Sequence, residues 1–184
     1  TRLVRGNLSR YDSWICYFTC FLPKITYGLD VMTHSRQALT TLQKPAISAT
    51  LSKLGFRRTI SRSIVFGSPT YGGLGLRDLH VAQGIAQLQL FIRHLRADSP
   101  QGKLLNIALA WWQLHAGVSW PLLERPDQPL PYLPTTWLTS VRSFLGDIQG
   151  TLHVTDAMAD LPSLARSEDQ YLMSALMGIP NVSK

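Results

Sequence analysis

Apolar residues recur every three or four positions along most of the chain, and this spacing predicts α-helices rather than strands. Three long helices are predicted, from about Ser35 to Leu54, from Asp78 to about Arg96 and from Ser99 to near Gly117. Each starts at a residue that can cap free amide groups, and glycine follows the first and the third. Their apolar positions are Ala38, Leu39, Leu42, Ile47, Leu51 and Leu54 in the first, Leu79, Ala82, Ile85, Ala86, Leu88, Ile92 and Leu95 in the second, and Leu104, Leu105, Ile107, Ala108, Trp111, Trp112 and Leu114 in the third.

An aromatic helix is predicted near the start of the chain, with Ser9 as its cap and Asp12 in its first turn. Proline lacks the amide hydrogen that a helix needs, so Pro23 is expected to end or kink this helix and Pro45 to interrupt the next one. We expect its apolar stripe to lie in the core rather than to stack on nucleic-acid bases. The stripe consists of Tyr11, Trp14, Ile15, Phe18, Phe21 and Leu22.

Shorter elements complete the prediction. Residues 59–66 could form a short helix or a strand, and the spacing of Ile60, Ile64 and Val65 favours the helix. Five prolines between Trp120 and Pro134 indicate an extended connector. A further helix follows from Thr135 or Thr136 through Leu145, residues 150–154 are a weak strand candidate, and residues 167–177 form a last short helix. The fold class is therefore all-α, a compact bundle of about five to seven helices. We expect one helical domain over residues 1–150 and a polar tail with a short helix over residues 151–184.

Charge is distributed unevenly along the chain, whose formal net charge is +7. Residues 1–62 contain ten lysines and arginines but only two acids, whereas residues 63–184 contain eight lysines and arginines and nine acids. No acidic residue lies between Asp30 and Asp78. This asymmetry favours a polyanionic partner for the N-terminal third, because Lys and Arg supply most sequence-independent affinity for phosphates. A solvated basic face that keeps the protein soluble is the alternative.

The stretch from Arg57 to Asp78 combines three arginines with a cluster of glycines at positions 67, 72, 73 and 75. Such a basic edge beside a tight turn could hold a phosphate backbone, or it could be a hinge between helices. We expect the glycines to act as a hinge that lets the helix after Asp78 fold back on the basic helices. The phosphate contacts are then assigned to the arginines.

No self-contained active site is evident in the sequence. Nucleotide-binding loops, nucleophile elbows and zinc-protease motifs are missing, and the five histidines are scattered. The acid pairs Asp156 with Asp160 and Glu168 with Asp169 are explained by capping. Cys16 and Cys20 read as reduced core cysteines, so neither a metal site nor a cofactor is predicted.

The sequence has no long apolar run and no signal-peptide pattern, which predicts an intracellular protein of the cytoplasm or nucleus without membrane association. The low charged fraction of 16% suggests that some apolar surface is covered by a partner or by missing parts of a longer chain. The chain begins at Thr1 rather than at methionine, which favours the second possibility. We therefore expect it to be part of a longer protein.

A series of short motifs runs along the first two thirds of the chain. The motifs are Leu22-Pro23-Lys24-Ile25-Thr26-Tyr27-Gly28-Leu29, Leu42-Gln43-Lys44-Pro45, the run from Val65 to Leu76, Gln83-Gly84 and His94-Leu95-Arg96. Their order and spacing over about residues 10–115 resemble the reverse transcriptases of non-LTR-type retrotransposons, specifically the segment that follows the catalytic palm, namely the thumb and its C-terminal extension.

The resemblance implies a helical module that grips the backbone of the template–primer duplex, with the missing palm of a longer polyprotein as a further partner. The Tyr-x-Asp-Asp turn of the palm has no counterpart here, so the chain is expected to lack polymerase activity by itself. The residues expected to contact phosphates are Arg57, Arg58 and Arg62, supported by Lys44, Lys53 and Arg77. The alternative is a helical protein-interaction module, or a decayed or repurposed retroelement remnant, that binds no nucleic acid.

Overall fold

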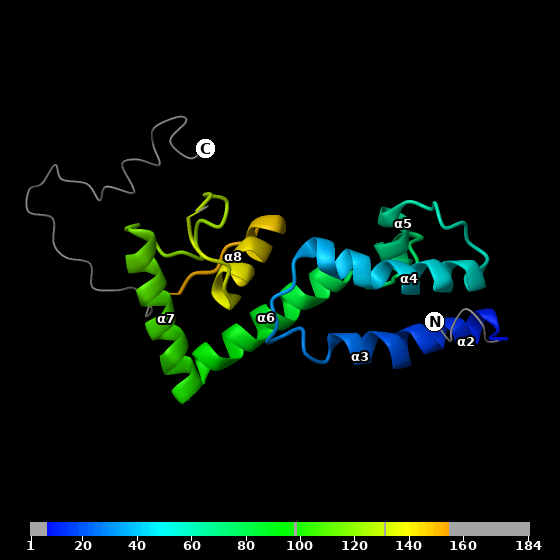
Figure 1. Cartoon of the computed structure of the whole chain (residues 1–184), viewed down its shortest axis with the longest axis horizontal. Helices are drawn as coiled ribbons and strands as arrows, with labels where there is room; N and C mark the ends of the chain where they lie inside the picture. Colours follow the sequence, from blue (N-terminus) through cyan, green and yellow to red (C-terminus); the bar gives the residue numbers. More distant parts are fainter. Residues whose placement is uncertain (1–6, 98, 131, 155–184) are drawn as a thin grey trace, which may run out of the picture. The chain divides into compact units, whose positions relative to one another are not determined.

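The computed structural model describes residues 7–97, 99–130 and 132–154, and these are helical or irregular with no strand among them (Figure 1). The predicted all-α class is thereby confirmed for this part of the chain. The helices are α2 (Arg10–Cys16), the π-helix η1 (Tyr17–Phe21), α3 (Leu22–Thr26), α4 (Arg36–Leu54), α5 (Arg62–Phe66), the 3₁₀ helix η2 (Pro69–Tyr71), α6 (Leu79–Arg96), α7 (Pro100–Ala116) and α8 (Trp137–Asp147).

The chain divides into two compact units, residues 1–87 and residues 88–184, with the division falling inside α6. This division lies within the region expected to form one domain. The predicted boundary near residue 150 stays a prediction, because residues 155–184, including the predicted helix at 167–177, lie outside the described residues.

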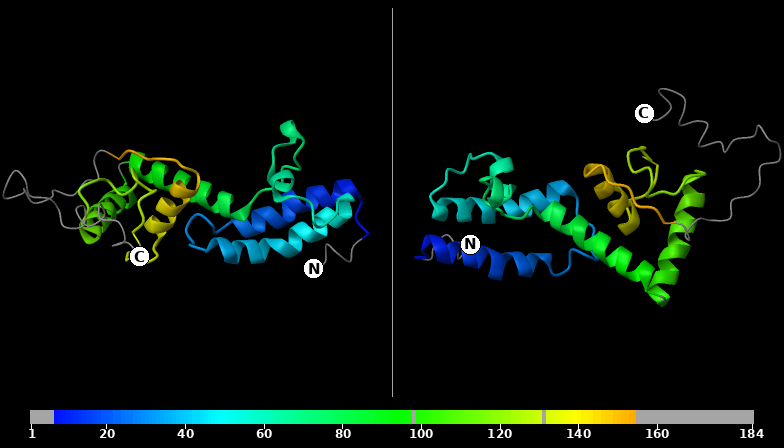
Figure 2. Two further views of the ribbon diagram at one scale, coloured as in Figure 1. Left: turned by 90° about the horizontal axis from the view of Figure 1, so that it is seen from above. Right: turned by 180° about the vertical axis from the view of Figure 1, so that it is seen from behind.

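In the N-terminal unit, α2, η1 and α3 follow one another as a single rod that runs beside α4 (Figure 2). Ser9 caps the rod by accepting from the Asp12 amide, as expected. Pro23 does not end the rod. In a regular α-helix the proline ring would clash with the carbonyl of the residue four positions earlier, and here the wider π-helical turn η1 lies directly before Pro23. The predicted stripe is partly wrong: Tyr11 and Ile15 are exposed, whereas Tyr17 is buried.

Helix α4 has the predicted bounds, with Ser35 accepting from the Ala38 amide and Gly55 in the left-handed conformation at its end. The predicted interruption at Pro45 is wrong, because the helix continues through this residue to Leu54. Its inner face also differs from the prediction, since Leu42 is 50% exposed and Gln43 is buried. A proline inside a helix costs one hydrogen bond, and burial of the flanking turns offsets that loss.

Three buried glutamines connect the helices of the N-terminal unit to loops. Gln43 on α4 donates to the Tyr17 hydroxyl and to the Arg77 carbonyl, and its Oε1 accepts from the Leu79 amide at 3.2 Å. On α6, Gln83 both donates to and accepts from the His34 backbone at 3.2 Å, while Gln87 donates to the Met32 carbonyl. Hydrophobic periodicity places such residues outward, so the sequence did not reveal these contacts.

The glycine-rich loop between α5 and α6 is a closed turn. The amides of residues 72–76 all donate to main-chain carbonyls of the same region, including Leu74 to Ile64 at 2.7 Å and Gly75 to Gly67 at 2.8 Å. A Cβ at Gly73 would overlap the Gly67 carbonyl, which explains why glycine is needed where the backbone at residue 73 passes close to the backbone at residue 67. The loop leads directly into α6, where Asp78 caps the helix by accepting from the His80 amide.

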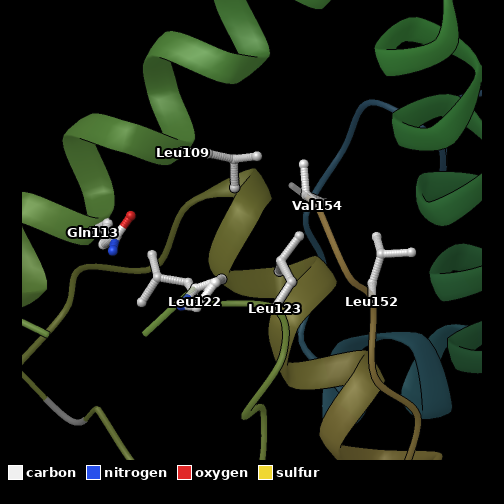
Figure 3. Close-up of a pocket in the computed structure, with 7 residues that line it drawn as sticks. Leu109, Gln113, Leu122, Leu123, Leu152 and Val154 are labelled. Atoms are coloured by element: carbon white, nitrogen blue, oxygen red, sulfur yellow. The ribbon is translucent and has the colours of Figure 1, made fainter. Parts of the chain in front are cut away.

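The C-terminal unit is built on an apolar core shared by the end of α6, α7, the proline-rich connector and α8. Its buried members are Phe91, Leu109, Trp112, Ala116, Val118, Leu122, Leu123, Leu130, Leu138, Val141 and Leu145. Figure 3 shows Leu109, Leu122, Leu123, Leu152 and Val154 converging from α7, the connector and the last described segment. They leave a cavity of about 20 Å³, little more than one water molecule needs.

The connector between α7 and α8 is held by the guanidinium of Arg142, a buried residue of α8. Its Nε donates to the Leu122 carbonyl at 3.0 Å, and its Nη2 donates to the carbonyls of Arg125 and Gln128 at 2.7 and 2.5 Å. Because the guanidinium is desolvated, the pKa of Arg142 is lowered. The connector therefore turns around a cation instead of running as an extended polyproline segment. Residues 151–154 follow α8 without forming the strand suggested by the sequence.

Two further expectations concern the cysteines and membranes. Cys16 and Cys20 are free thiols, but Cys20 is exposed, so its predicted core position is wrong. Burial and then the neighbouring Cys20 raise the pKa of Cys16. Across the described ranges, no helix combines the length and the apolar character that crossing a membrane requires.

Candidate nucleic-acid interface

Helix α4 presents Arg36, Thr40 and Lys44 along one side, because residues four apart lie above one another on a helix. Helix α5 faces this side with Arg62, Ser63 and Phe66, and together they border an open hollow of about 370 Å³. We call this the cationic hollow; Gln43, Ile47 and Asp78 are the other described residues that line it. The hollow thus combines three cations and two hydroxyl groups with an apolar wall formed by Ile47 and Phe66.

The three cations of the cationic hollow are available to a ligand. Arg36, Lys44 and Arg62 are exposed, and none of them forms an ion pair with another residue in the part of the chain that the structure describes. Side chains of like charge gathered on one hollow repel one another, and an anion bound between them relieves that repulsion. Their arrangement suits a phosphate group better than a neutral ligand.

Among the described residues, Asp78 is the one carboxylate that lines the cationic hollow. Its Oδ1 accepts from the His80 amide at 2.8 Å, so it serves as the N-terminal cap of α6. The positive end of the helix dipole partly compensates the negative charge of this carboxylate. Its presence therefore reduces, but does not cancel, the positive character of the hollow.

The predicted site residues fall into two groups. Lys44 and Arg62 line the cationic hollow, and Arg77 borders it, because its carbonyl accepts from the hollow-lining Gln43 while its side chain is exposed. Lys53, Arg57 and Arg58 instead lie at and after the C-terminal end of α4.

The second group has a structural explanation as well as a functional one. The Arg58 Nε donates to Ser52 Oγ at 3.0 Å, and the guanidinium of Arg10 lies against Gly55 at the end of α4. Cations near the last carbonyls of a helix are stabilised by its dipole, whatever else they bind. Arg57 makes no such contact among the described residues, and its side chain is exposed.

Arg36 is the functional candidate that the sequence reasoning missed. It was counted in the basic third of the chain, but it was not assigned to the site. The signal was present, because Arg36, Thr40 and Lys44 have the i, i+4, i+8 spacing of one helix face. The amides of residues 72–76 are already paired within the glycine-rich loop, so they offer no free donors to a phosphate.

Acidic and metal-binding chemistry is not concentrated anywhere in the described residues, which contain no group of three or more His, Cys, Asp or Glu side chains placed to hold a metal ion. Comparison of the chain with known protein families, with curated proteins and with solved structures gives no significant match.

Proposed function

We propose that this chain is a non-catalytic, thumb-like nucleic-acid-binding segment of a retroelement RNA-directed DNA polymerase. In this proposal the N-terminal unit grips the sugar–phosphate backbone of a template–primer duplex. The observation that carries it is the cationic hollow, where Arg36, Lys44 and Arg62 converge without acidic partners among the described residues. The motif order noted in the sequence supplies the reverse-transcriptase part of the proposal.

The chemistry of the hollow explains how such a grip would work. Guanidinium groups donate two parallel hydrogen bonds to a phosphate, and a lysine adds a point charge. Ser63 offers a hydroxyl donor beside these cations, so one phosphate can be met by charge and by a hydrogen bond together. None of these groups reads a base edge, and binding is therefore expected to be independent of sequence.

The test is the affinity of the full chain for a short RNA–DNA hybrid, measured by fluorescence anisotropy over a range of salt concentrations. Arg62→Gln and Lys44→Gln should each weaken binding several-fold and lower the salt slope by about 1, because each removes one phosphate contact. Arg93→Gln, which removes an exposed arginine outside the hollow, is the matched control. It should leave both quantities nearly unchanged.

Two outcomes would count against the proposal. Absence of binding at low salt by a folded chain would leave the alternative of a protein-interaction module or retroelement remnant. Equal losses for Arg62→Gln and Arg93→Gln would mean that net charge, rather than the cationic hollow, holds the nucleic acid. The affinity of the double variant Arg57→Gln/Arg58→Gln then shows whether the arginines after α4 contribute to binding independently of the hollow.

A further inference from the structure

Helix α7 is apolar on two opposite sides. One side packs into the core of the C-terminal unit through Leu109, Trp112 and Ala116. The other side exposes four large apolar side chains, with exposed fractions of 64% for Leu104, 65% for Ile107, 56% for Trp111 and 51% for Leu114. At 100° per residue these four fall within an arc of about 80°. We call them the α7 stripe.

The spacing of the α7 stripe matches one particular kind of partner. Its members are separated by three, four and three residues, which is the alternation of a and d positions in a coiled coil. Side chains with this spacing interdigitate with those of another helix that carries the same spacing. The sequence expectation assigned these residues to an apolar face without separating the buried side from this exposed one.

Trp111 is already held in place on this surface. Its ring stacks on His115 with 5.2 Å between centroids and 7° between planes, and it meets Trp112 edge-on at 5.0 Å. A side chain fixed in this way loses little rotamer freedom when a partner covers it. Trp is also the residue type that most often anchors protein interfaces.

Charge identifies the partner. Lys103 is the only residue of α7 with a permanent charge, and the helix contains no acid. The four residues of the stripe are themselves uncharged, so two identical stripes meet without repulsion. We propose that the α7 stripe pairs with the α7 stripe of a second copy of this chain, related by a twofold axis.

The area of the stripe sets the expected strength of the pair. Four half-exposed side chains bury on the order of 400 Å² on each copy, which is at the low end for specific interfaces. The pair should therefore be reversible, with a dissociation constant on the order of 10 to 100 µM. The proposal does not depend on nucleic-acid binding, because the α7 stripe and the cationic hollow share no residue.

Sedimentation equilibrium of the full chain over about 5 to 500 µM tests the proposal. The runs use about 0.5 M NaCl, which screens association through charge or through bound nucleic acid while leaving apolar contacts intact. The unmodified chain should show a monomer–dimer equilibrium. Ile107→Glu should raise its dissociation constant at least tenfold, because it places two carboxylates against apolar surface. Ile85→Glu, on the exposed side of α6, is the matched control and should not change it.

Folding is checked for each variant by circular dichroism, and Leu114→Glu provides a second substitution at the same stripe. Tryptophan emission should also shift to the blue with rising concentration in the unmodified chain, and this shift should largely disappear in Trp111→Phe. A chain that stays monomeric over the whole range overturns the proposal. So does association that Ile107→Glu and Leu114→Glu leave unchanged.

Discussion

The two units of this protein hold their helices together by different means. The N-terminal unit combines two small apolar clusters with glutamines that bind backbone groups of loops. In its described residues, the C-terminal unit relies on an extensive apolar core and on the buried guanidinium of Arg142. Their surfaces differ as well. Residues 1–87 carry eleven lysines and arginines and three acids, whereas residues 88–184 carry seven lysines and arginines and eight acids.

This difference connects stability with the proposed function. Gln43 lines the cationic hollow and at the same time binds the backbone at Arg77 and Leu79, on either side of Asp78. The polar contacts of the N-terminal unit therefore fix the segments that border its cations. In the C-terminal unit, the buried arginine fixes a loop, and the exposed surface of α7 is apolar. One unit is suited to an anion and the other to apolar contact.

The largest effect is expected where the C-terminal unit depends on one charge. Arg142→Met should lower the free energy of unfolding by about 3 kcal/mol, because the carbonyls of Leu122, Arg125 and Gln128 lose their donor together. Urea denaturation followed by circular dichroism measures the loss.

Arg125→Met is the matched control for this prediction. Both guanidinium groups lie 5.9 Å from the Trp120 ring, but Arg125 is exposed. Its replacement should cost less than about 1 kcal/mol. Similar losses for the two variants would show that the ring contact, and not the set of carbonyls, makes Arg142 important.

A smaller loss is expected at the corresponding position of the N-terminal unit. Gln43→Met keeps the length of the side chain but removes its hydrogen bonds to Tyr17, Arg77 and Leu79, so we expect a loss of about 2 kcal/mol. Gln37→Met, at an exposed position of the same helix, should change stability by less than about 0.5 kcal/mol. If Gln43→Met were as stable as the unmodified chain, apolar packing alone would hold this unit as well.

Local signals predicted the helices well, because caps act within a few residues. Ser35, Ser99 and Thr136 accept the amide hydrogen bonds expected of them, and Gly55 and Gly117 adopt the left-handed conformation at helix ends. These interactions need no knowledge of the rest of the fold.

The burial of individual faces was less predictable. Gln43, Gln83 and Gln87 are buried because their partners are loop backbone groups, which hydrophobic periodicity does not take into account. Helix α7 is apolar nearly all round, so its pattern could not say which side faces the core.

The sequence indicated which part of the chain carries the basic site, but not which individual residues line it. The acid-free stretch pointed to the right part of the chain, and Lys44 and Arg62 do border one hollow. Arg36 joins them only because α4 and α5 border the same hollow, which no local pattern specifies. Lys53 and Arg58 are close in sequence to Arg62, yet they lie at the end of α4 outside the lining of that hollow.

The smallest effect concerns a buried phenol of the N-terminal unit and its dependence on pH. Tyr17 is fully buried, and this desolvation raises its pKa above the ordinary value. Above about pH 10 the unfolded chain ionises at this residue while the folded chain keeps its proton. The unfolded state then binds fewer protons, so the free energy of unfolding falls as pH rises.

Tyr17→Phe removes this contribution, together with the hydrogen bonds to Gln43 and Arg77. At pH 8 we expect it to cost about 1 kcal/mol, and the difference from the unmodified chain should shrink as pH rises from about 9 to 11. Urea denaturation at several pH values measures this difference, with Tyr71→Phe, which removes an exposed phenol, as the control at pH 8. A difference that stays constant over that range would mean that the phenol of Tyr17 reaches solvent in the folded protein. The glutamine contacts would then exclude water from the N-terminal unit less completely than the apolar core does in the C-terminal unit.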